Sequence, residues 1–465
     1  MSKKKTSKNK IGKVNPLLFS ILYAIFKPMY KKKYNVTFDN EIAKKIKGPA
    51  IIIATHSSDK DHFLSALTLY PIRPTYVVSE HFIRFKSSAR LLKLMHVITK
   101  KMFTPDFSTV KNIMRAKKEN AVIVIFAEGR QSCYGHTLPL AQGTAELIKA
   151  LGVDLYLWQS DGAYLTFPKW RDKGDDRIGK IHLKLKPLLS ADEVASKNVS
   201  EIQEITERAI NHDEELAMPG VEFKSETMAR GAERILFKCP ICLCEDTITT
   251  EGDHIRCSCG LDATLDGFYK LHNAPFERMN DWFEWQQESI DVENGHLATK
   301  ARLGCCGEDG FMDPNAGEGE VYMDKDTFRL TGTLHGESFE YVTKPEKIGA
   351  FPISPGDHFD GYANYLLRKT YLSCYLYCKR ATRLTLLQLK ERTDILHIEH
   401  HSTIGYTLRA GCIILYIRVV CCYHTITTTL KQSLKDSLRN GSTDNGLRTR
   451  TKLVDEYQCA LRCSL

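Results

Sequence analysis

Long hydrophobic runs are missing from this sequence of 465 residues. Its two candidates, residues 16–26 (PLLFSILYAIF) and 412–423 (CIILYIRVVCCY), hold 11 and 12 residues, and Arg418 interrupts the second. A helix that spans a bilayer needs about 20 apolar residues. Both runs are therefore too short to span, and a content of 43% hydrophobic and 26% charged residues is typical of a globular protein.

Acidic residues are absent from the first 33 residues, which carry ten lysines around the apolar run 16–26. Such a segment favours a helix that lies in the membrane interface and is held there by anionic lipids. Lysines on both sides favour the cytoplasmic face of the cell membrane. A buried first helix with a basic tail is the alternative. No small-x-small cleavage site follows, only KPMYKKKY, which counts against a secretory signal peptide.

A disulfide framework is not indicated either. The chain has 15 cysteines, but it is too long for a small disulfide scaffold, and five of the cysteines cluster between residues 239 and 259 with metal-like spacing. This usage predicts a reducing compartment.

The sequence does contain alternating strand-like and helix-like segments over residues 50–215. Apolar runs rich in β-branched residues are typical of parallel strands covered on both faces. Amphipathic helices are expected at 108–120, with Ser108 as a cap, and at 143–152, with Gly152 as a stop. The alternation predicts an α/β domain with a mostly parallel sheet flanked by helices, whose ligands gather at the carboxyl ends of strands. The expected strands are AIIIAT (50–55), PTYVVS (74–79), AVIVIFA (121–127) and VDLYLWQ (153–159).

Composition and patterning divide the rest of the chain into smaller parts, in keeping with the two to four domains that its length suggests. Residues 320–351 alternate apolar and polar side chains, which predicts antiparallel strands. The expected division is 1–33 membrane-interface segment, 34–217 α/β domain, 218–234 linker, 235–272 cysteine module, 273–367 β-rich region and 368–465 atypical tail.

The first candidate for chemistry follows the strand AIIIAT, where His56 comes next and Asp61 stands five positions later. A carboxylate in the following turn can accept the ring N–H, fix the tautomer and stabilise the imidazolium, which leaves the other nitrogen free to take a proton from a hydroxyl. We interpret the pair as catalytic. The same spacing also occurs in surface turns, and Asp59 and His62 compete for the two roles.

A second strand, in IFAEGRQS (125–132), ends in Glu128, Gly129 and Arg130. Gly129 permits a tight turn with a close approach of the backbone. Arg130 presents a fork of donors that suits a phosphate, and Glu128 can bind a hydroxyl or orient the arginine. An ordinary turn with a solvated ion pair is the alternative.

Together the two motifs resemble those of the glycerolipid acyltransferase family, the 1-acylglycerol-3-phosphate acyltransferases, which carry His-x4-Asp and Phe-Pro-Glu-Gly-x-x-Ser. HSSDKD matches the first fully. FAEGRQS departs from the second, because Ala127 replaces the proline and Gln131 stands at the usual arginine position, one place after Arg130. DGAYLTFPKW (161–170) and GKIHLKLKPLLSADEV (179–194) are similar to a bacterial branch of the family. The resemblance covers residues 14–216, and the downstream module more loosely.

The resemblance implies transfer of a fatty acyl group from an acyl thioester to the hydroxyl of a lysophospholipid, above all lysophosphatidic acid. The donor would be acyl-CoA or an acyl carrier protein, and the reaction would take place at the membrane surface. His56 would act as the general base and Asp61 would orient it, with no covalent acyl-enzyme. Residues 79–101 lie where the family's second block sits, so the acceptor phosphate would bind near Arg130 and a basic residue among Arg84, Lys100 and Lys101.

Three other interpretations of these motifs remain open. A binding or regulatory protein on a degenerate acyltransferase scaffold is favoured by Ala127 and Gln131. An α/β hydrolase is disfavoured because no Gly-x-Ser-x-Gly elbow occurs in the α/β region. A nucleophilic Cys133 would need a partner such as His136. Nucleic acid is not expected as a partner.

The cysteine module contains KCPICLC (238–244) and IRCSCGLD (255–262), two cysteine pairs separated by a hairpin-length stretch. Four thiolates on two such turns suit a tetrahedral structural Zn²⁺. The second pair is closely spaced, so Cys244 or His254 could replace one ligand, and a ribbon without metal is the alternative. The expected ligands of this zinc-ribbon-like module are Cys239, Cys242, Cys257 and Cys259.

Overall fold

The computed structural model describes most of the first 345 residues with their side chains, and two later strands by their backbone alone. The apolar run 412–423 and most of the atypical tail lie outside the described residues. The described ranges are 10–101, 106–172, 174–306, 309–345, 360–367 and 370–377.

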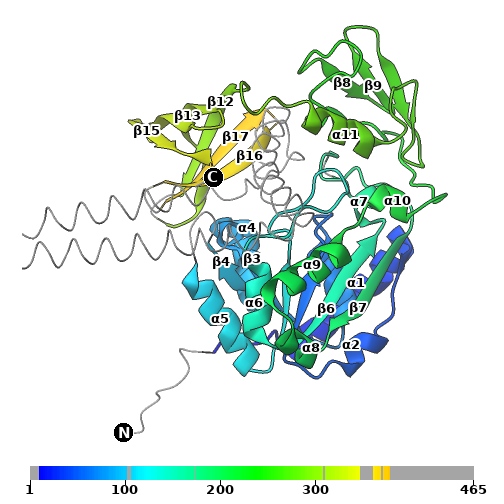
Figure 1. The fold of residues 1–465 in the computed structure, drawn as a ribbon, viewed down its shortest axis with the longest axis vertical. Helices are drawn as coiled ribbons and strands as arrows, with labels where there is room; N and C mark the ends of the chain where they lie inside the picture. Colours follow the sequence, from blue (N-terminus) through cyan, green and yellow to red (C-terminus); the bar gives the residue numbers. More distant parts are fainter. Residues whose placement is uncertain are drawn as a thin grey trace, which may run out of the picture. The chain divides into compact units, whose positions relative to one another are not determined.

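A mixed sheet of seven strands forms the centre of the first domain (Figure 1). Its strands are β1 (Val36–Thr37), β2 (Ala50–Ala54), β3 (Thr75–Ser79), β4 (Ile98–Lys100), β5 (Val122–Phe126), β6 (Asp154–Asp161) and β7 (Ile181–Leu189). They lie in the order β1-β7-β6-β2-β5-β3-β4, and only the β6–β7 pair is antiparallel. The mostly parallel sheet and its four expected strands are confirmed.

Helices cover both faces of this sheet. They are α1 (Pro16–Tyr34), α2 (Glu41–Lys45), α3 (Asp61–Leu69), η1 (Glu80–Arg84), α4 (Lys86–Leu94), α5 (Phe107–Lys118), α6 (Thr144–Leu151), α7 (Ala163–Thr166), α8 (Ala191–Ser196), α9 (Val199–Ile210) and α10 (Glu214–Ala217).

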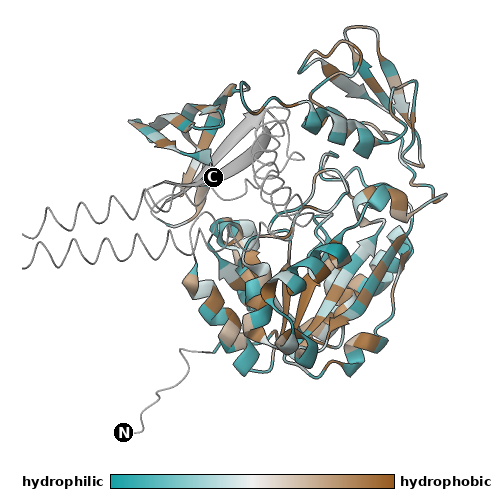
Figure 2. Cartoon of the chain, viewed as in Figure 1, coloured by the Kyte–Doolittle hydropathy of each residue, from teal (hydrophilic) through white to brown (hydrophobic). Residues whose placement is uncertain are grey.

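The central strand β2 is apolar at every position because it is buried on both sides. Ile52 packs into a core with side chains of α1, α2 and α3. Ile51 and Ile53 point to the other face, into a core with side chains of α5, α6 and α9. Figure 2 shows these apolar strands in brown between helices that carry hydrophilic residues.

The helix boundaries differ slightly from the sequence expectations. Helix α5 is capped by Asp106, whose carboxylate accepts the backbone N–H groups of Ser108 and Thr109. The expected cap, Ser108, lies inside the first turn, so that assignment was wrong. Helix α6 ends as expected, because Gly152 adopts a left-handed conformation with φ of 53°.

Helix α1 has one packed face and one exposed apolar face. Phe19, Tyr30 and Tyr34 are buried against the domain, and the Tyr23 ring stacks on Tyr70 at 3.7 Å. The first helix is therefore docked on the domain, and its outer side chains at four-residue spacing remain apolar. None of the described helices is long and apolar enough to cross a membrane. The exposed apolar positions of α1 are Leu17, Ile21, Ile25 and Met29.

The cysteine module is a four-stranded antiparallel sheet in the order β11-β10-β9-β8. The segment 218–234, which we interpreted as a linker, is packed: Phe223 and Met228 are buried in one core with residues of both the α/β domain and the module. The elements are η2 (Ala232–Arg234), β8 (Ile248–Glu251), β9 (His254–Cys257), β10 (Asp262–Leu265) and β11 (Leu271–His272).

The β-rich region begins with a helix that its sequence pattern did not reveal, α11 (Met279–Glu288), and continues as an antiparallel sheet. The expected antiparallel strands over 320–351 are found in β13, β14 and β15. The strands, in the order β15-β14-β13-β12-β17-β16, are β12 (Leu297–Cys306), β13 (Met312–Met323), β14 (Phe328–Leu334), β15 (Glu337–Thr343), β16 (Asp360–Leu367) and β17 (Thr370–Tyr377).

Candidate active site

His56 and Asp61 form a hydrogen-bonded pair at the carboxyl edge of the sheet. His56 lies two residues beyond the end of β2, and Asp61 is the first residue of α3. The His56 Nδ1 atom lies 2.9 Å from Asp61 Oδ2. The Asp61 side chain is fully buried, whereas the His56 side chain keeps 16% of its surface exposed. The pair can therefore be reached only from the imidazole side.

The hydrogen bonds of Asp61 determine which nitrogen of His56 carries the proton. Asp61 Oδ2 accepts the backbone N–H of Ser58 at 2.9 Å, which favours the ionised carboxylate, and an ionised carboxylate accepts the proton of His56 Nδ1. This leaves Nε2 without a proton and able to act as a base. Burial opposes charge on both residues: it lowers the pKa of His56 to about 3 and raises the pKa of Asp61 well above its usual value. The imidazole is therefore neutral at physiological pH.

The competing residues are placed differently. Asp59 pairs with Lys60 at 2.8 Å on the exposed side of the turn. The His62 ring packs edge-on against His56 with centroids 5.6 Å apart, and against Phe126. The structure thus pairs His56 with Asp61 rather than with Asp59. Phe126 also covers one face of the His56 ring, at 4.3 Å between centroids.

Glu128 holds the backbone of the turn between β2 and α3 (residues 55–60), which we call the catalytic turn because it carries the candidate base His56. Its Oε1 accepts the His56 backbone N–H at 2.6 Å, and its Oε2 accepts the Leu138 backbone N–H at 2.8 Å. The side chain is buried, and burial raises its pKa to about 8 while these two N–H groups act in the opposite direction. Glu128 therefore ties the backbone at His56 to the backbone at Leu138, and a contact of Glu128 with the acceptor hydroxyl stays a prediction.

The residues that follow Glu128 in the second motif also hydrogen-bond to the turn that carries His56. The Ser132 backbone N–H donates to the His56 carbonyl at 2.8 Å, and the Gln131 amide donates to the Ser57 carbonyl at 3.3 Å. Gly129 has φ of 71°, and a Cβ atom there would lie 3.2 Å from that of Ala141. Arg130 is buried at 8% exposure, at the turn between these contacts. Gln131, the residue that departs from the family pattern, thus braces the turn.

A second buried carboxylate, Glu214 of α10, holds the other side of the catalytic turn. It accepts the Ser57 hydroxyl at 2.8 Å, together with the backbone N–H groups of Gly162 and Tyr164. Burial raises the pKa of Glu214 to about 8, against the effect of these donors. Sequence reasoning missed this residue, because it lies 157 positions from Ser57 in a short polar helix without a motif.

The three basic residues expected near the phosphate are Arg84, Lys100 and Lys101, and each has a different position and different contacts. Arg84 forms an ion pair with Glu80 and donates to the Gly310 carbonyl at 3.4 Å. Lys100 ends strand β4, whose carboxyl end faces the same edge as those of β2 and β5. Lys101 follows it, and its backbone N–H donates to Asp106 at 2.7 Å. Phosphate binding by any of the three stays a prediction.

The thiol alternative is not supported by the contacts of His136. Its Nδ1 lies 3.3 Å from Glu284 and its Nε2 lies 3.1 Å from Asn211, so neither nitrogen faces Cys133.

The four expected metal ligands come together. The Sγ atoms of Cys239 and Cys259 are 3.7 Å apart, those of Cys242 and Cys257 are 3.8 Å apart, and all four lie within 4.8 Å of one another. Four sulfurs at about 2.3 Å from one Zn²⁺ would be about 3.8 Å apart in a tetrahedron. The closely spaced second pair therefore fits. The alternative ligands lie outside this group of four: Cys244 is exposed and His254 pairs with Asp262.

Comparison with known proteins finds a match within the first domain. Residues 33–157 match the model of the family described as Acyltransferase, a segment that contains His56, Asp61 and Glu128 to Arg130. This part of the α/β domain is therefore similar to the acyltransferase family. The fold is also similar to the crystal structure of the 1-acyl-sn-glycerophosphate (LPA) acyltransferase PlsC from Thermotoga maritima. That match has 16% identity and a TM-score of 0.34, and it covers 42% of this chain and 78% of that one.

Proposed function

We propose that this protein is an O-acyltransferase that moves a fatty acyl group from an acyl thioester to the hydroxyl of a lysophospholipid, converting lysophosphatidic acid to phosphatidic acid. The proposal rests mainly on the hydrogen bond from His56 Nδ1 to Asp61, which leaves Nε2 available at the carboxyl edge of the sheet. The donor is acyl-CoA or an acyl carrier protein.

The proposed reaction needs one base and no covalent enzyme intermediate. His56 Nε2 takes the proton of the acceptor hydroxyl while the oxygen forms a bond to the thioester carbonyl carbon. Asp61 stabilises the imidazolium that results. When the tetrahedral intermediate collapses, the C–S bond breaks, and the departing thiolate takes the proton back from His56. The ester and the free thiol are the products, and the enzyme returns to its starting state.

The direct test is an acyl-transfer assay with membranes that contain the protein. Lysophosphatidic acid serves as acceptor, and labelled acyl-CoA or acyl carrier protein serves as donor. We expect labelled phosphatidic acid with at least one donor. Release of free fatty acid at the same rate with and without the acceptor would contradict the proposal and identify a thioester hydrolase.

We further propose that α1 holds the protein on the cytoplasmic face of the cell membrane. Its outer face carries the four exposed apolar side chains of α1, and the same helix contains Lys27, Lys31, Lys32 and Lys33. Apolar side chains next to several lysines suit a surface of anionic lipid. The acceptor and the product of the proposed reaction are membrane lipids, so this contact would bring the site to its substrate.

A double substitution, Ile21→Asp with Ile25→Asp, is expected to weaken binding to anionic lipid vesicles at least about 100-fold in a sedimentation assay. Each isoleucine loses about 1.5–3 kcal/mol of apolar burial, and about 1.4 kcal/mol corresponds to a factor of ten. Val342→Asp is the matched control, because Val342 is an equally exposed apolar residue on β15. Equal vesicle binding by the double variant and the wild type would remove α1 as the membrane contact.

The cysteine module is proposed to hold one structural Zn²⁺. The sulfur-to-sulfur distances of Cys239 with Cys259 and of Cys242 with Cys257 support this proposal, because they match a tetrahedral S₄ site.

A further inference from the structure

Lys169 lies in the stretch DGAYLTFPKW (161–170), which borders the catalytic turn and to which the sequence analysis assigned no catalytic or binding role. The Trp170 ring N–H donates to the Tyr164 hydroxyl at 2.9 Å, and that hydroxyl donates to the Cys133 carbonyl at 3.5 Å. On its other side, Arg171 lies 3.5 Å from Asp59. Lys169 is thus held between the loop that follows β5 and the loop that follows β2, the two loops that build the candidate active site.

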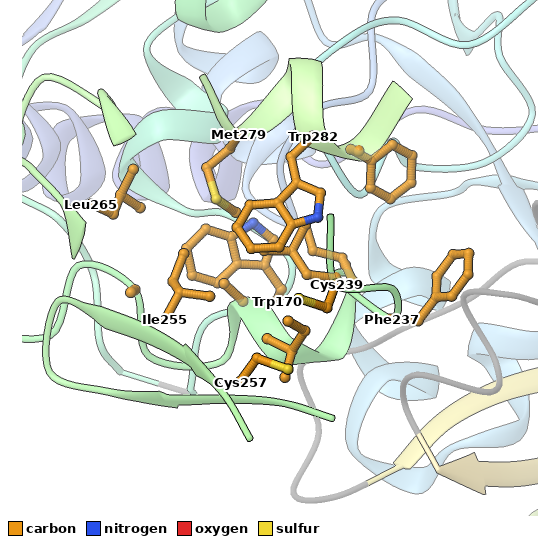
Figure 3. Close-up of a cluster of buried hydrophobic side chains, with 14 of the residues drawn as sticks. Trp170, Phe237, Cys239, Ile255, Cys257, Leu265, Met279 and Trp282 are labelled. Atoms are coloured by element: carbon orange, nitrogen blue, oxygen red, sulfur yellow. The ribbon is translucent and has the colours of Figure 1, made fainter. Parts of the chain in front are cut away.

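The backbone around Lys169 is firmly anchored. Trp170 is completely buried, and the Arg177 guanidinium lies over its ring at 4.7 Å. Arg234 donates to the Trp170 carbonyl at 2.7 Å. Figure 3 shows Trp170 among buried side chains of the cysteine module, including Cys239 and Cys257. A lysine on such a segment is a pre-positioned charge rather than a mobile surface group.

The charge of Lys169 is not neutralised within the described part of the chain, where no carboxylate lies within ion-pair distance of its amino group. Burial lowers the pKa of Lys169 and the positive charge of Arg130 acts in the same direction, whereas Cys133 and the more distant carboxylate of Asp59 act to raise it. The pKa of His56 is lowered mainly by burial, and the charge of Lys169 is the second largest cause. Its neighbour Arg171, by contrast, pairs with both Asp59 and Asp176. Two desolvated cations close to one base repel each other, and a bound anion would relieve that repulsion.

We propose that Lys169 is a further substrate-binding residue, which holds the phosphate of the acceptor beside His56 and so selects phosphorylated over neutral lysolipids. The proposal rests on the proposed function. A phosphate is also present in the acyl donor, in its phosphopantetheine arm, so the same chemistry has two sources. The acceptor is favoured, because its phosphate lies within a few bonds of the hydroxyl that His56 deprotonates.

The test compares Lys169→Gln and Lys169→Arg with the wild type, and uses Lys180→Gln, an exposed lysine of the same domain, as the control. We expect Lys169→Gln to raise the KM for lysophosphatidic acid about 10–100-fold, the effect of one hydrogen bond to a charged group. Activity with monoacylglycerol and the KM for the acyl donor should not change, and Lys169→Arg should restore most of the loss. A raised KM for the donor, or equal losses with both acceptors, would overturn the proposal.

A pH profile provides a readout that a purely structural role would not change. Without the charge of Lys169, the pKa of His56 should rise toward its usual value, because the imidazolium is no longer repelled. The acid limb of kcat/KM is therefore expected at higher pH in Lys169→Gln than in the wild type and in Lys169→Arg. Identical acid limbs in all three proteins would contradict a position of Lys169 next to His56.

Binding without turnover separates this proposal from the proposed function. Calorimetric titration with sn-glycerol 3-phosphate should show affinity about tenfold or more lower for Lys169→Gln than for Lys180→Gln. If the wild type binds this anion but transfers no acyl group, the binding role of Lys169 stands and the proposed function fails. Equal affinities would overturn the role of Lys169. The midpoint of thermal unfolding checks the folding of Lys169→Gln. It should not fall, because removal of an unpaired desolvated charge relieves repulsion. If Lys169→Gln misfolds, Lys169→Met takes its place in the test.

Discussion

Replacement of His56 by alanine is expected to lower kcat for acyl transfer by about 10²–10⁴-fold, the usual contribution of a positioned general base. The effect should fall on kcat, with KM changed little, because His56 interacts with the hydroxyl proton mainly in the transition state. The measurement is the rate of phosphatidic acid formation at saturating donor and acceptor.

Two further variants make this result specific. Asp61→Asn keeps the shape of the side chain but no longer favours the tautomer with the proton on Nδ1, so we expect a large loss of kcat there too. His272→Ala is the control, because His272 is an exposed histidine whose ring pairs with Asp266. Full activity of a folded His56→Ala protein would mean that another group takes the proton, and the mechanism would then be wrong.

Loss of the proposed Zn²⁺ is expected to have the second largest effect. Metal analysis should find one zinc per chain. Cys257→Ser should bind less zinc and lower the midpoint of thermal unfolding by at least about 6 °C. Loss of a structural metal commonly costs more than about 3 kcal/mol, and each kcal/mol shifts the midpoint by about 2–4 °C in a domain of this size. Acyl transfer should decline as well, because Trp170 packs in the same core as Cys239 and Cys257.

The chain offers a matched control for this prediction. Cys244 lies in the same turn as Cys242 but is exposed and outside the group of four sulfurs. Cys244→Ser should therefore keep the zinc content, the unfolding midpoint and the activity of the wild type. Equal midpoints for Cys257→Ser and Cys244→Ser, with no zinc in the wild-type protein, would show that the module is stable without metal.

Several features of the fold follow from local sequence alone. The run AIIIA predicts a strand buried on both faces, and its side chains do alternate between the two cores. Helix α6 ends where Gly152 adopts a left-handed conformation. The cap of α5 was misplaced, because both Asp106 and Ser108 are good capping residues and only the backbone geometry distinguishes them.

Other features depend on contacts that no local pattern encodes. The segment 218–234 has the composition of a linker, yet Phe223 is buried because residues of two distant regions surround it. Helix α11 was missed because its sequence follows a cysteine module and precedes strands, and its Trp282 and Phe283 are buried by those neighbours.

The candidate site also combines features that follow from local sequence with features that depend on distant contacts. Local patterns are enough to predict the chemical groups of the candidate sites. His56 with Asp61, the Glu128–Arg130 turn and the four cysteines are recognisable because each set lies within a few residues or repeats a known spacing. The contacts that hold these groups in place, by contrast, are formed only in the folded chain. Glu128 reaches back 72 positions to His56, Glu214 reaches 157 positions to Ser57, and Lys169 is placed beside the catalytic turn by a tryptophan buried next to the cysteine module. The physical reason is that hydrogen bonds and packing act over a few ångströms in space, and only the folded chain brings such distant residues that close.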